Sequence, residues 1–529
     1  MKKRILYLSL MLTLTACTAK DNTPLIDSSI SAVVETKLEY KIEKSVLSKG
    51  YQSIIPKVET LANERGRLFL VNLGVTECSI ASIDSISRIN NEVNIYTSVE
   101  KEMGKTDIVV PQFTLEIEDI KDSNYSDLKF NIVPMNYTPI ELKFDRSQVL
   151  NKVYTQLNYT DNAMPSVSLV KENDEYIWNV SINNTFIKNN PSSPIYMLNV
   201  KVNSNSGELI EAKPIMVSTT IDKGKVLGLA DDKLLAYVQK ETVENSDTEN
   251  IWIYDIYSQE KQKVYSTHNY VYSANFSPDL KKLAVIEHNG KVSDLYIVEL
   301  ESKLVQKITP MDYRKIWNIE WKDNNLFYGV NNDKDNKSSI LLFDVTKNEP
   351  EELFSVRINV TSFDSSNGTF VFVENDAPKD TSNIYTKEDG KRIKKMDSGI
   401  NGEFINNDKI LYTKKYDKEE KFELYIYDLN EDKEKLIVDL DVRKFLVIDK
   451  ENILLVSKNT TSSDFSIYLY NLNDHKPPTL LGQVLDRNVF YSSKTNTIFF
   501  NIVPPSESST SDIIYGIDFS KLINGEKDS

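Results

Sequence analysis

The sequence is poor in cysteine, histidine and positive charge, and each shortage argues against a class of function. Only two cysteines and three histidines occur in 529 residues. Lys and Arg number 63 against 78 Asp and Glu, which gives a formal net charge of −15. Because a surface this acidic repels phosphate backbones, we expect no nucleic-acid partner.

Common catalytic motifs are also missing. The sequence contains no Gly-x-Ser-x-Gly elbow, no phosphate-binding loop and no His-Glu-x-x-His pair. The histidines, His268, His288 and His475, stand too far apart for a metal-binding pair. We therefore predict no catalytic residue, no metal and no cofactor. One alternative stays open, because a glycosidase-like carboxylate pair assembles in space and leaves no motif.

The N-terminus has an apolar run, but it is too short to span a membrane. Lys2, Lys3 and Arg4 precede an apolar run over residues 5–15, about half the ~20 residues that span a bilayer. This pattern is typical of a signal peptide. The run ends in Leu14, Thr15, Ala16 and Cys17, which resembles the bacterial lipobox. The resemblance implies cleavage after Ala16, acylation of Cys17 with palmitate-type chains, and a lipid anchor on the extracytoplasmic face of the cell membrane.

Cys78 is the other cysteine. If lipid consumes Cys17, no pair remains for an intramolecular disulfide, so stability must come from packing. No neighbouring cation or helix N-terminus lowers the pKa of Cys78 in the local sequence, and we expect a buried, inert thiol.

What the chain does contain is a repeat. Seven similar strands, rich in Ile, Leu and Tyr, each close on an acidic or amide residue. They cover residues 251–255, 295–299, 340–344, 384–388, 424–428, 467–471 and 514–518. An apolar strand precedes each of them, at 234–238, 283–286, 326–330, 370–373, 410–412, 453–456 and 498–500. The mean spacing near 44 residues is typical of four-stranded propeller blades.

The second repeat contains Ser277, Pro278 and Asp279 before Leu280 and Lys281. This turn resembles the repeats of TolB-type and WD-type β-propellers, with Leu280 in place of the usual Gly. The resemblance implies a seven-bladed β-propeller over residues 222–525. Radial closure removes exposed sheet edges without a disulfide.

The loops between the second and third strands of the blades look long and acidic. In an up-and-down blade they emerge on one face, and we predict that this face binds a cationic or polar partner. A solvated rim is the equally weighted alternative. The candidate residues are Glu241, Glu244, Asp247, Asp333, Asp335, Asp376, Asp380, Asp417 and Glu419.

Residues 17–60 are predicted to be a lipid-anchored spacer. Alternating strands over 61–140 indicate a small β module, which weakly resembles the PrcB type associated with protease complexes. A helix at 147–157, strands near Trp178 and 196–202, and a hairpin at Gly207 predict an α+β module over 145–217, similar to PepSY domains.

The sequence as a whole predicts a mainly β, extracytoplasmic lipoprotein that binds an envelope protein or polymer without catalysis. Two alternatives remain. PrcB-type and PepSY modules are both associated with control of extracellular proteases, which implies a modulator of a secreted peptidase. Carboxylates at the propeller mouth would instead suit an envelope enzyme acting on glycan or peptide.

Overall fold

A computed structural model describes residues 35–519, except 64–65, 121–126, 162–164, 244–245, 309–314, 323–324, 333–336, 346, 348, 377–380, 416–420, 460–464, 475 and 506–510. The chain divides into two compact units, residues 1–141 and 142–529. The predicted signal peptide and Cys17 lie outside the described residues. No helix within the described ranges is both long and apolar enough to cross a bilayer.

The first unit consists of two packed sheets. One has the order β1-β6-β7-β9 and the other the order β2-β8-β4-β3, with β5 paired to β8. The strands are β1 (Thr36–Leu38), β2 (Tyr40–Ser48), β3 (Lys57–Asn63), β4 (Gly66–Asn72), β5 (Thr76–Cys78), β6 (Ile80–Ile89), β7 (Glu92–Glu100), β8 (Asp107–Ile117) and β9 (Lys129–Pro134). Alternate apolar side chains such as Phe69, Ile95 and Phe113 form the shared core.

Two predictions are tested in this unit. The predicted spacer reaches residue 60, but β1 pairs with β6 and β2 with β8, so the folded module begins near Thr36. The sequence signal of β2 is weak, because it is an edge strand whose side chains are mostly exposed. Cys78 is fully buried beside Val99 and Val109, as predicted.

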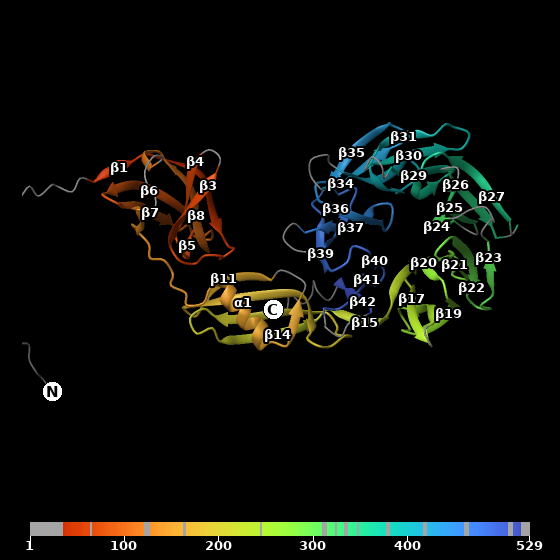
Figure 1. Cartoon of the computed structure of the whole chain (residues 1–529), viewed down its shortest axis with the longest axis horizontal. Helices are drawn as coiled ribbons and strands as arrows, with labels where there is room; N and C mark the ends of the chain where they lie inside the picture. Colours follow the sequence, from red (N-terminus) through yellow and green to blue (C-terminus); the bar gives the residue numbers. More distant parts are fainter. Residues whose placement is uncertain are drawn as a thin grey trace, which may run out of the picture. The chain divides into compact units, whose positions relative to one another are not determined.

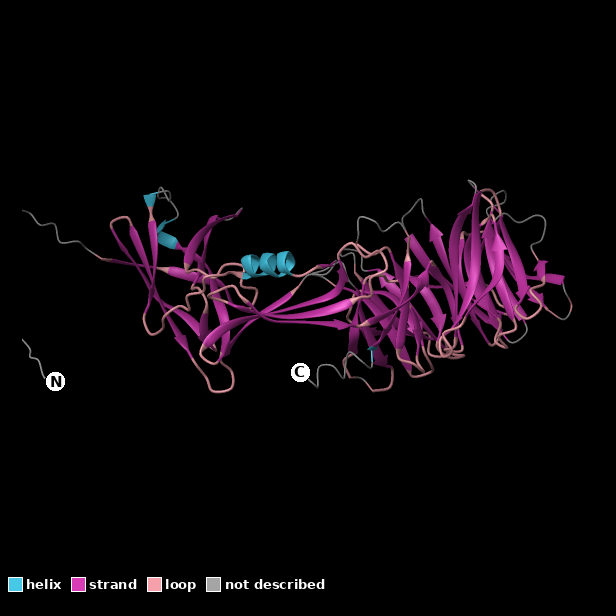
Figure 2. Cartoon of the chain, turned by 90° about the horizontal axis from the view of Figure 1, so that it is seen from below, coloured by secondary structure: helices cyan, strands magenta, loops and turns pink. Residues whose placement is uncertain are grey.

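The second unit opens with a helix on a five-stranded sheet. Helix α1 (Arg146–Gln156) is capped at its N-terminus by Asp145, whose carboxylate accepts a 2.8 Å hydrogen bond from Gln148 N. The strands are β10 (Tyr159–Asp161), β11 (Ser166–Glu172), β12 (Glu175–Ile187), β13 (Tyr196–Asn203) and β14 (Leu209–Met216). Figure 2 shows the helix lying along one side of these long strands. Trp178 is buried and donates to Phe144 O, and Gly207 has a φ of 66°, as the hairpin requires.

The rest of the described chain is a β-propeller. It contains seven four-stranded antiparallel sheets, six of which are formed by four consecutive strands. Their strands are β16 (Lys225–Ala230), β17 (Leu234–Val243), β18 (Ser246–Asp255), β19 (Lys261–Thr267); β20 (Tyr270–Phe276), β21 (Lys282–His288), β22 (Ser293–Glu299), β23 (Val305–Lys307); β24 (Lys315–Lys322), β25 (Asn325–Asn332), β26 (Lys337–Asp344), β27 (Glu349–Val356); β28 (Val360–Ser366), β29 (Thr369–Asp376), β30 (Thr381–Glu388), β31 (Lys394–Ser398); β32 (Ile400–Phe404), β33 (Lys409–Lys415), β34 (Phe422–Asp428), β35 (Lys433–Val438); and β36 (Val442–Val447), β37 (Asn452–Lys458), β38 (Phe465–Asn471), β39 (Thr479–Val484).

The seventh sheet joins distant parts of the chain. Strand β15 (Ser218–Lys223) pairs with β42 (Ile513–Asp518), followed by β41 (Thr497–Ile502) and β40 (Phe490–Ser492). A strand that precedes the repeats therefore completes the last sheet. The predicted propeller start at 222 falls inside β15, because its polar sequence, with Thr219, Thr220 and Asp222, does not look like the other strands.

Apolar side chains join each sheet to the next around the ring. Figure 1 shows the sheets following one another around a common centre, with β23, β27 and β31 at the outer rim and β20 and β24 nearer the middle. Six buried clusters link successive sheets, and a seventh, with Tyr237 and Ile514, links the last sheet to the first. Burial between sheets therefore closes the ring, which accounts for a fold without a disulfide among the described residues.

The turn at Ser277 has the structural role that its sequence predicts. Ser277 Oγ donates to Asp279 Oδ1 at 2.7 Å, and Lys281 N donates to the same oxygen at 3.1 Å. Leu280 adopts a φ of 57°, a conformation that favours glycine. The hydrogen-bonded Asp279 thus holds the turn although the usual Gly is missing.

Candidate functional site

Strand register places seven residues at one level of the inner strands β16, β20, β24, β28, β32, β36 and β40. In each sheet, this first-strand residue pairs with a second-strand residue, which in turn pairs with a third-strand residue. The third-strand residue lies two positions before the acidic or amide residue that closes the repeat. The seven residues, here called the channel row, are Gly228, Asn275, Glu320, Asp364, Glu403, Leu446 and Phe490.

A pocket of about 350 Å³ lies where the channel row meets the turns between first and second strands. Gly228, Asn275, Glu320 and Phe490 of the row line it, together with Trp321. The indole Nε1 of Trp321 donates to Asn275 O at 3.1 Å, and Asn275 Nδ2 donates to Ile319 O at 2.9 Å. These bonds join the second and third sheets and fix one wall of the pocket.

Three neighbouring sheets each contribute a carboxylate to the row. Lys322 Nζ lies 3.0 Å from Glu320 and 3.8 Å from Asp364. Asp364 Oδ2 accepts a 2.6 Å hydrogen bond from Phe404 N on the next sheet. Glu403 follows on β32, near Asp364 on one side and Lys444 on the other. The three carboxylates therefore form one continuous polar arc along the inside of the ring.

The environment of this arc disfavours full ionisation. Burial, and then the charge of Asp364, raise the pKa of Glu320 to about 8. Burial and the same neighbour raise the pKa of Glu403 to about 7. Burial also lowers the pKa of Lys444, against the opposing effect of Glu403. Such groups are candidates for a functional site because their protonation can change near neutral pH.

The predicted acidic loop face is only partly visible. Glu241 and Asp247 are exposed on the first sheet. Asp247 pairs with Lys240 at 2.6 Å and accepts a 2.7 Å bond from Thr242. The described side chains do not include the other seven candidates, Glu244, Asp333, Asp335, Asp376, Asp380, Asp417 and Glu419, so the face stays a prediction.

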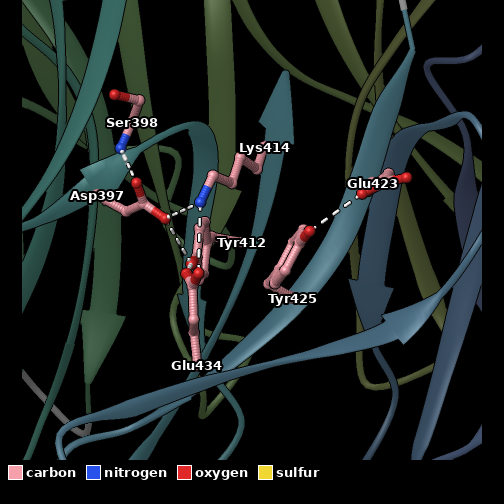
Figure 3. Close-up of polar contacts among 7 residues, drawn as sticks. All are labelled: Asp397, Ser398, Tyr412, Lys414, Glu423, Tyr425 and Glu434. Carbon is pink, nitrogen blue, oxygen red and sulfur yellow. Dashed lines mark hydrogen bonds and ion pairs between the residues drawn. The ribbon is translucent and has the colours of Figure 1, made fainter. Parts of the chain in front are cut away.

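A second polar cluster joins the fourth and fifth sheets (Figure 3). The Tyr412 hydroxyl, which has one proton to donate, contacts Asp397 at 3.0 Å and also Glu434, while Lys414 Nζ lies 2.6 Å from Asp397 and 3.3 Å from Glu434. Ser398 N donates to the remaining Asp397 oxygen at 2.7 Å. Its charged groups are already paired with one another, so the cluster acts as a link between sheets.

None of the channel-row residues was predicted from the sequence. A signal was present, because Glu320, Asp364 and Glu403 interrupt apolar strands at intervals of 44 and 39 residues, close to the repeat length. Each belongs to a first strand, whereas the repeat was recognised from the more hydrophobic second and third strands. In the part of the chain that the structure describes, no three His, Cys, Asp or Glu side chains are arranged to hold a metal ion.

Comparison with known proteins identifies no family. No protein-family model matches the chain, and no curated protein matches it. Among solved structures, it is similar to an oligogalacturonate lyase from Vibrio parahaemolyticus (11% identity over 68% of this chain and 98% of that chain, TM-score 0.45). It is also similar to TolB from Acinetobacter baumannii (11%, 66% and 86%, 0.34) and to the β-propeller domain of the Trilobed protease from Pyrococcus furiosus (16%, 60% and 97%, 0.37). The sheets and their packing, described above, establish the propeller independently.

Proposed function

We propose that this chain is an extracytoplasmic lipoprotein, anchored to the cell membrane through acylated Cys17, that binds its partner without catalysis. The binding element is a seven-bladed propeller, and the channel pocket is its binding site. Support for the anchor comes from the sequence of residues 2–17. Support for the blade number comes from the seven sheets and the clusters between them.

The observation that carries the proposal is the pocket beside the channel row. Concave sites with apolar walls and a few fixed polar groups are the usual sites of ligand binding. Here Trp321 and Phe490 supply apolar wall, while Asn275 and Glu320 supply hydrogen-bonding groups. The hydrogen bonds between sheets hold these side chains in place before any ligand arrives, which reduces the entropy lost on binding.

The modules before the propeller belong to the proposal as accessory elements. We infer a PepSY-like fold for residues 145–217 from α1, the long strands and the Gly207 hairpin. In that hairpin, Asn203 Oδ1 accepts bonds from Asn205 N at 2.9 Å and Ser206 N at 3.0 Å. This resemblance to PepSY domains favours a role in the control of a secreted peptidase. In that role, the binding partner would be a protein.

A second candidate function is hydrolysis of an envelope glycan or peptide. The observation that favours it is the contact between Glu320 and Asp364, two carboxyl groups in different environments. Two carboxyl groups in contact can share one proton, as in acid proteases. A glycosidase pair is separated by about 5 Å or more, so this contact favours a peptide over a glycan as substrate. Turnover of a glycan and peptide library by the purified protein, lost in Glu320→Gln, would replace the binding proposal with this one.

A pull-down from detergent-solubilised membranes tests the main proposal. The full chain, a Trp321→Ala variant and an Asp247→Asn variant are compared. Channel binding predicts that Trp321→Ala loses the partner and Asp247→Asn keeps it. The reverse result would move the site to the acidic loop face. Recovery of a peptidase would support the regulatory role, and incorporation of labelled fatty acid that disappears in Cys17→Ala would support the anchor.

A further inference from the structure

We propose that the channel row binds a positively charged amine of its ligand between Glu320, Asp364 and Glu403. This inference rests on the proposed binding function and names the chemistry of that site. The ligand would place its cation on the carboxylate arc and its apolar part against Trp321 and Phe490.

The charges around the arc leave room for one more cation. The arc holds three carboxyl groups, and two lysines face it: Lys322 beside Glu320 and Asp364, and Lys444 beside Glu403. Asp486 and Arg487 also face Lys444 and offset each other. The oxygens of Asp364 accept from Ser365 N at 2.7 Å and Phe404 N at 2.6 Å. Those of Glu320 contact Lys322 at 3.0 Å and Ser365 Oγ at 3.4 Å. The open place for a cation is therefore at Glu403.

The carboxyl group of Glu403 gives separate evidence for a ligand, because it has no bonding partner among the described residues. Protein surrounds its carboxyl group on nearly every side, yet part of its surface stays open. Within the described residues, no hydrogen bond or ion pair joins this carboxyl group to another side chain or to the backbone. Because buried charged groups are normally paired, an unpartnered carboxylate at this level favours a ligand that supplies the missing donor.

The walls of the site fit an amine better than a metal ion. Lys444 already lies over the ring of Phe490, with 5.3 Å from Nζ to the ring centroid, so this ring accepts a cation. The pocket of about 350 Å³, which Glu320 lines at one end of the arc, has room for one side chain or a small organic amine. A bound ammonium group would replace the proton that burial and the charge of Asp364 keep on Glu320.

Calorimetric titration of the purified protein tests the proposal with three probes. 1,5-Diaminopentane supplies a free amine, and an acetylated Gly-Lys-Gly amide supplies a lysine side chain. 1,5-Pentanediol is the uncharged control of similar length. Binding by the diamine indicates a free small ligand, whereas binding by the peptide alone indicates a side chain of a partner protein. Equal heats from the diol and the amines, or no binding by either amine, would overturn the proposal.

Variants locate the binding. We expect Glu403→Gln and Asp364→Asn to weaken amine binding about 10- to 100-fold, the effect of losing a charged hydrogen bond. Glu301→Gln, at an exposed carboxylate in the turn between β22 and β23, is the matched control and should leave affinity unchanged. Thermal unfolding of each variant separates lost binding from lost folding. A folded Glu403→Gln variant with unchanged affinity contradicts the proposal.

A pH series adds a readout that a structural role would not change. Affinity should rise about tenfold or more from pH 6 to pH 9, because the carboxyl groups lose protons while the amine keeps its charge. A flat profile contradicts the proposal. If the amines fail to bind while Trp321→Ala still loses the membrane partner, the amine inference falls and the channel-binding function survives. If Trp321→Ala keeps the partner, the function itself fails.

Discussion

The hydroxyl group of Tyr237 donates a hydrogen bond of 2.9 Å to Asp222, which lies on the closing strand β15 of the preceding sheet. The same relationship recurs four repeats further on, between Tyr412 of the fifth sheet and Asp397 of the fourth. Both tyrosines are the fourth residue of a second strand, β17 for Tyr237 and β33 for Tyr412. A buried phenol that reaches an outer-strand carboxylate therefore acts as a repeated link between sheets.

The two links differ in their third partner. Lys261 on β19 contacts Asp222 in the first case, and Glu434 on β35 stands at the equivalent place in the second. Lys414 supplies the positive charge that balances Glu434. The position of the charge changes between repeats, but each aspartate keeps a lysine.

Removing the Tyr412 hydroxyl should destabilise the propeller. Tyr412→Phe leaves Asp397 and Glu434 with Lys414 as their shared donor, and the expected loss is about 1.5–3 kcal/mol, the range for a hydrogen bond to a charged group. The free energy of unfolding in urea measures the effect. Tyr257→Phe, at a tyrosine that is 57% exposed, is the control and should change little. Equal stability of the two variants would contradict the proposed link.

Gly329 should tolerate no larger side chain. A Cβ atom there would overlap the Trp317 ring, although the Gly329 backbone itself is unstrained. Gly329→Ala should displace the indole, break its 2.7 Å bond to Asn331, and cost about 1–3 kcal/mol. Denaturation monitored by tryptophan fluorescence measures both effects. Combining it with Trp317→Leu should recover part of the loss; no recovery would argue against steric overlap.

The channel acids should make the protein less stable at alkaline pH. Their folded-state pKa values, about 8 for Glu320 and about 7 for Glu403, lie above those of the unfolded chain. The folded state therefore holds more protons between about pH 4.5 and pH 8, and stability falls as pH rises through this window. Melting temperatures of Glu320→Gln and Glu403→Gln should decline less from pH 5 to pH 9 than that of the wild type. Parallel declines would contradict the assignment.

Cys78 should react with thiol reagents only after unfolding. Burial raises its pKa to about 11, so roughly one thiol in a thousand is ionised at pH 8. In a Cys17→Ser chain, iodoacetamide labelling followed by mass spectrometry should be slow in the native protein and rapid in denaturant. Fast native labelling would show that the core around Val99 and Val109 opens readily.

The apolar repeats were predictable because their chemistry is local. Every predicted second and third strand lies within an observed strand, such as residues 410–412 within β33 and 424–428 within β34. Helix α1 begins one residue before its predicted start. In these elements, side-chain periodicity and turn residues were sufficient to predict where the strands lie.

The remaining features depend on contacts between distant residues. Strand β15 has no strong pattern of its own and is ordered by pairing with β42, nearly 300 residues later. The channel row likewise requires the register of each sheet, since Glu320, Asp364 and Glu403 are brought together by ring closure and by no shared motif. The sequence pattern therefore predicted a binding site at the acidic loops, and most of the residues predicted there lie outside the described side chains.

The pairing of β15 with β42 also has a mechanical consequence. Any tension that enters from the N-terminal side of β15 reaches the ring at the one sheet whose strands come from both ends of the propeller. That load would act on the ladder between Ser218 and Ile517 and on the Tyr237 link to Asp222 before any other blade. The ring would thus open first between β15 and β42, while the six sheets built from consecutive strands would stay folded.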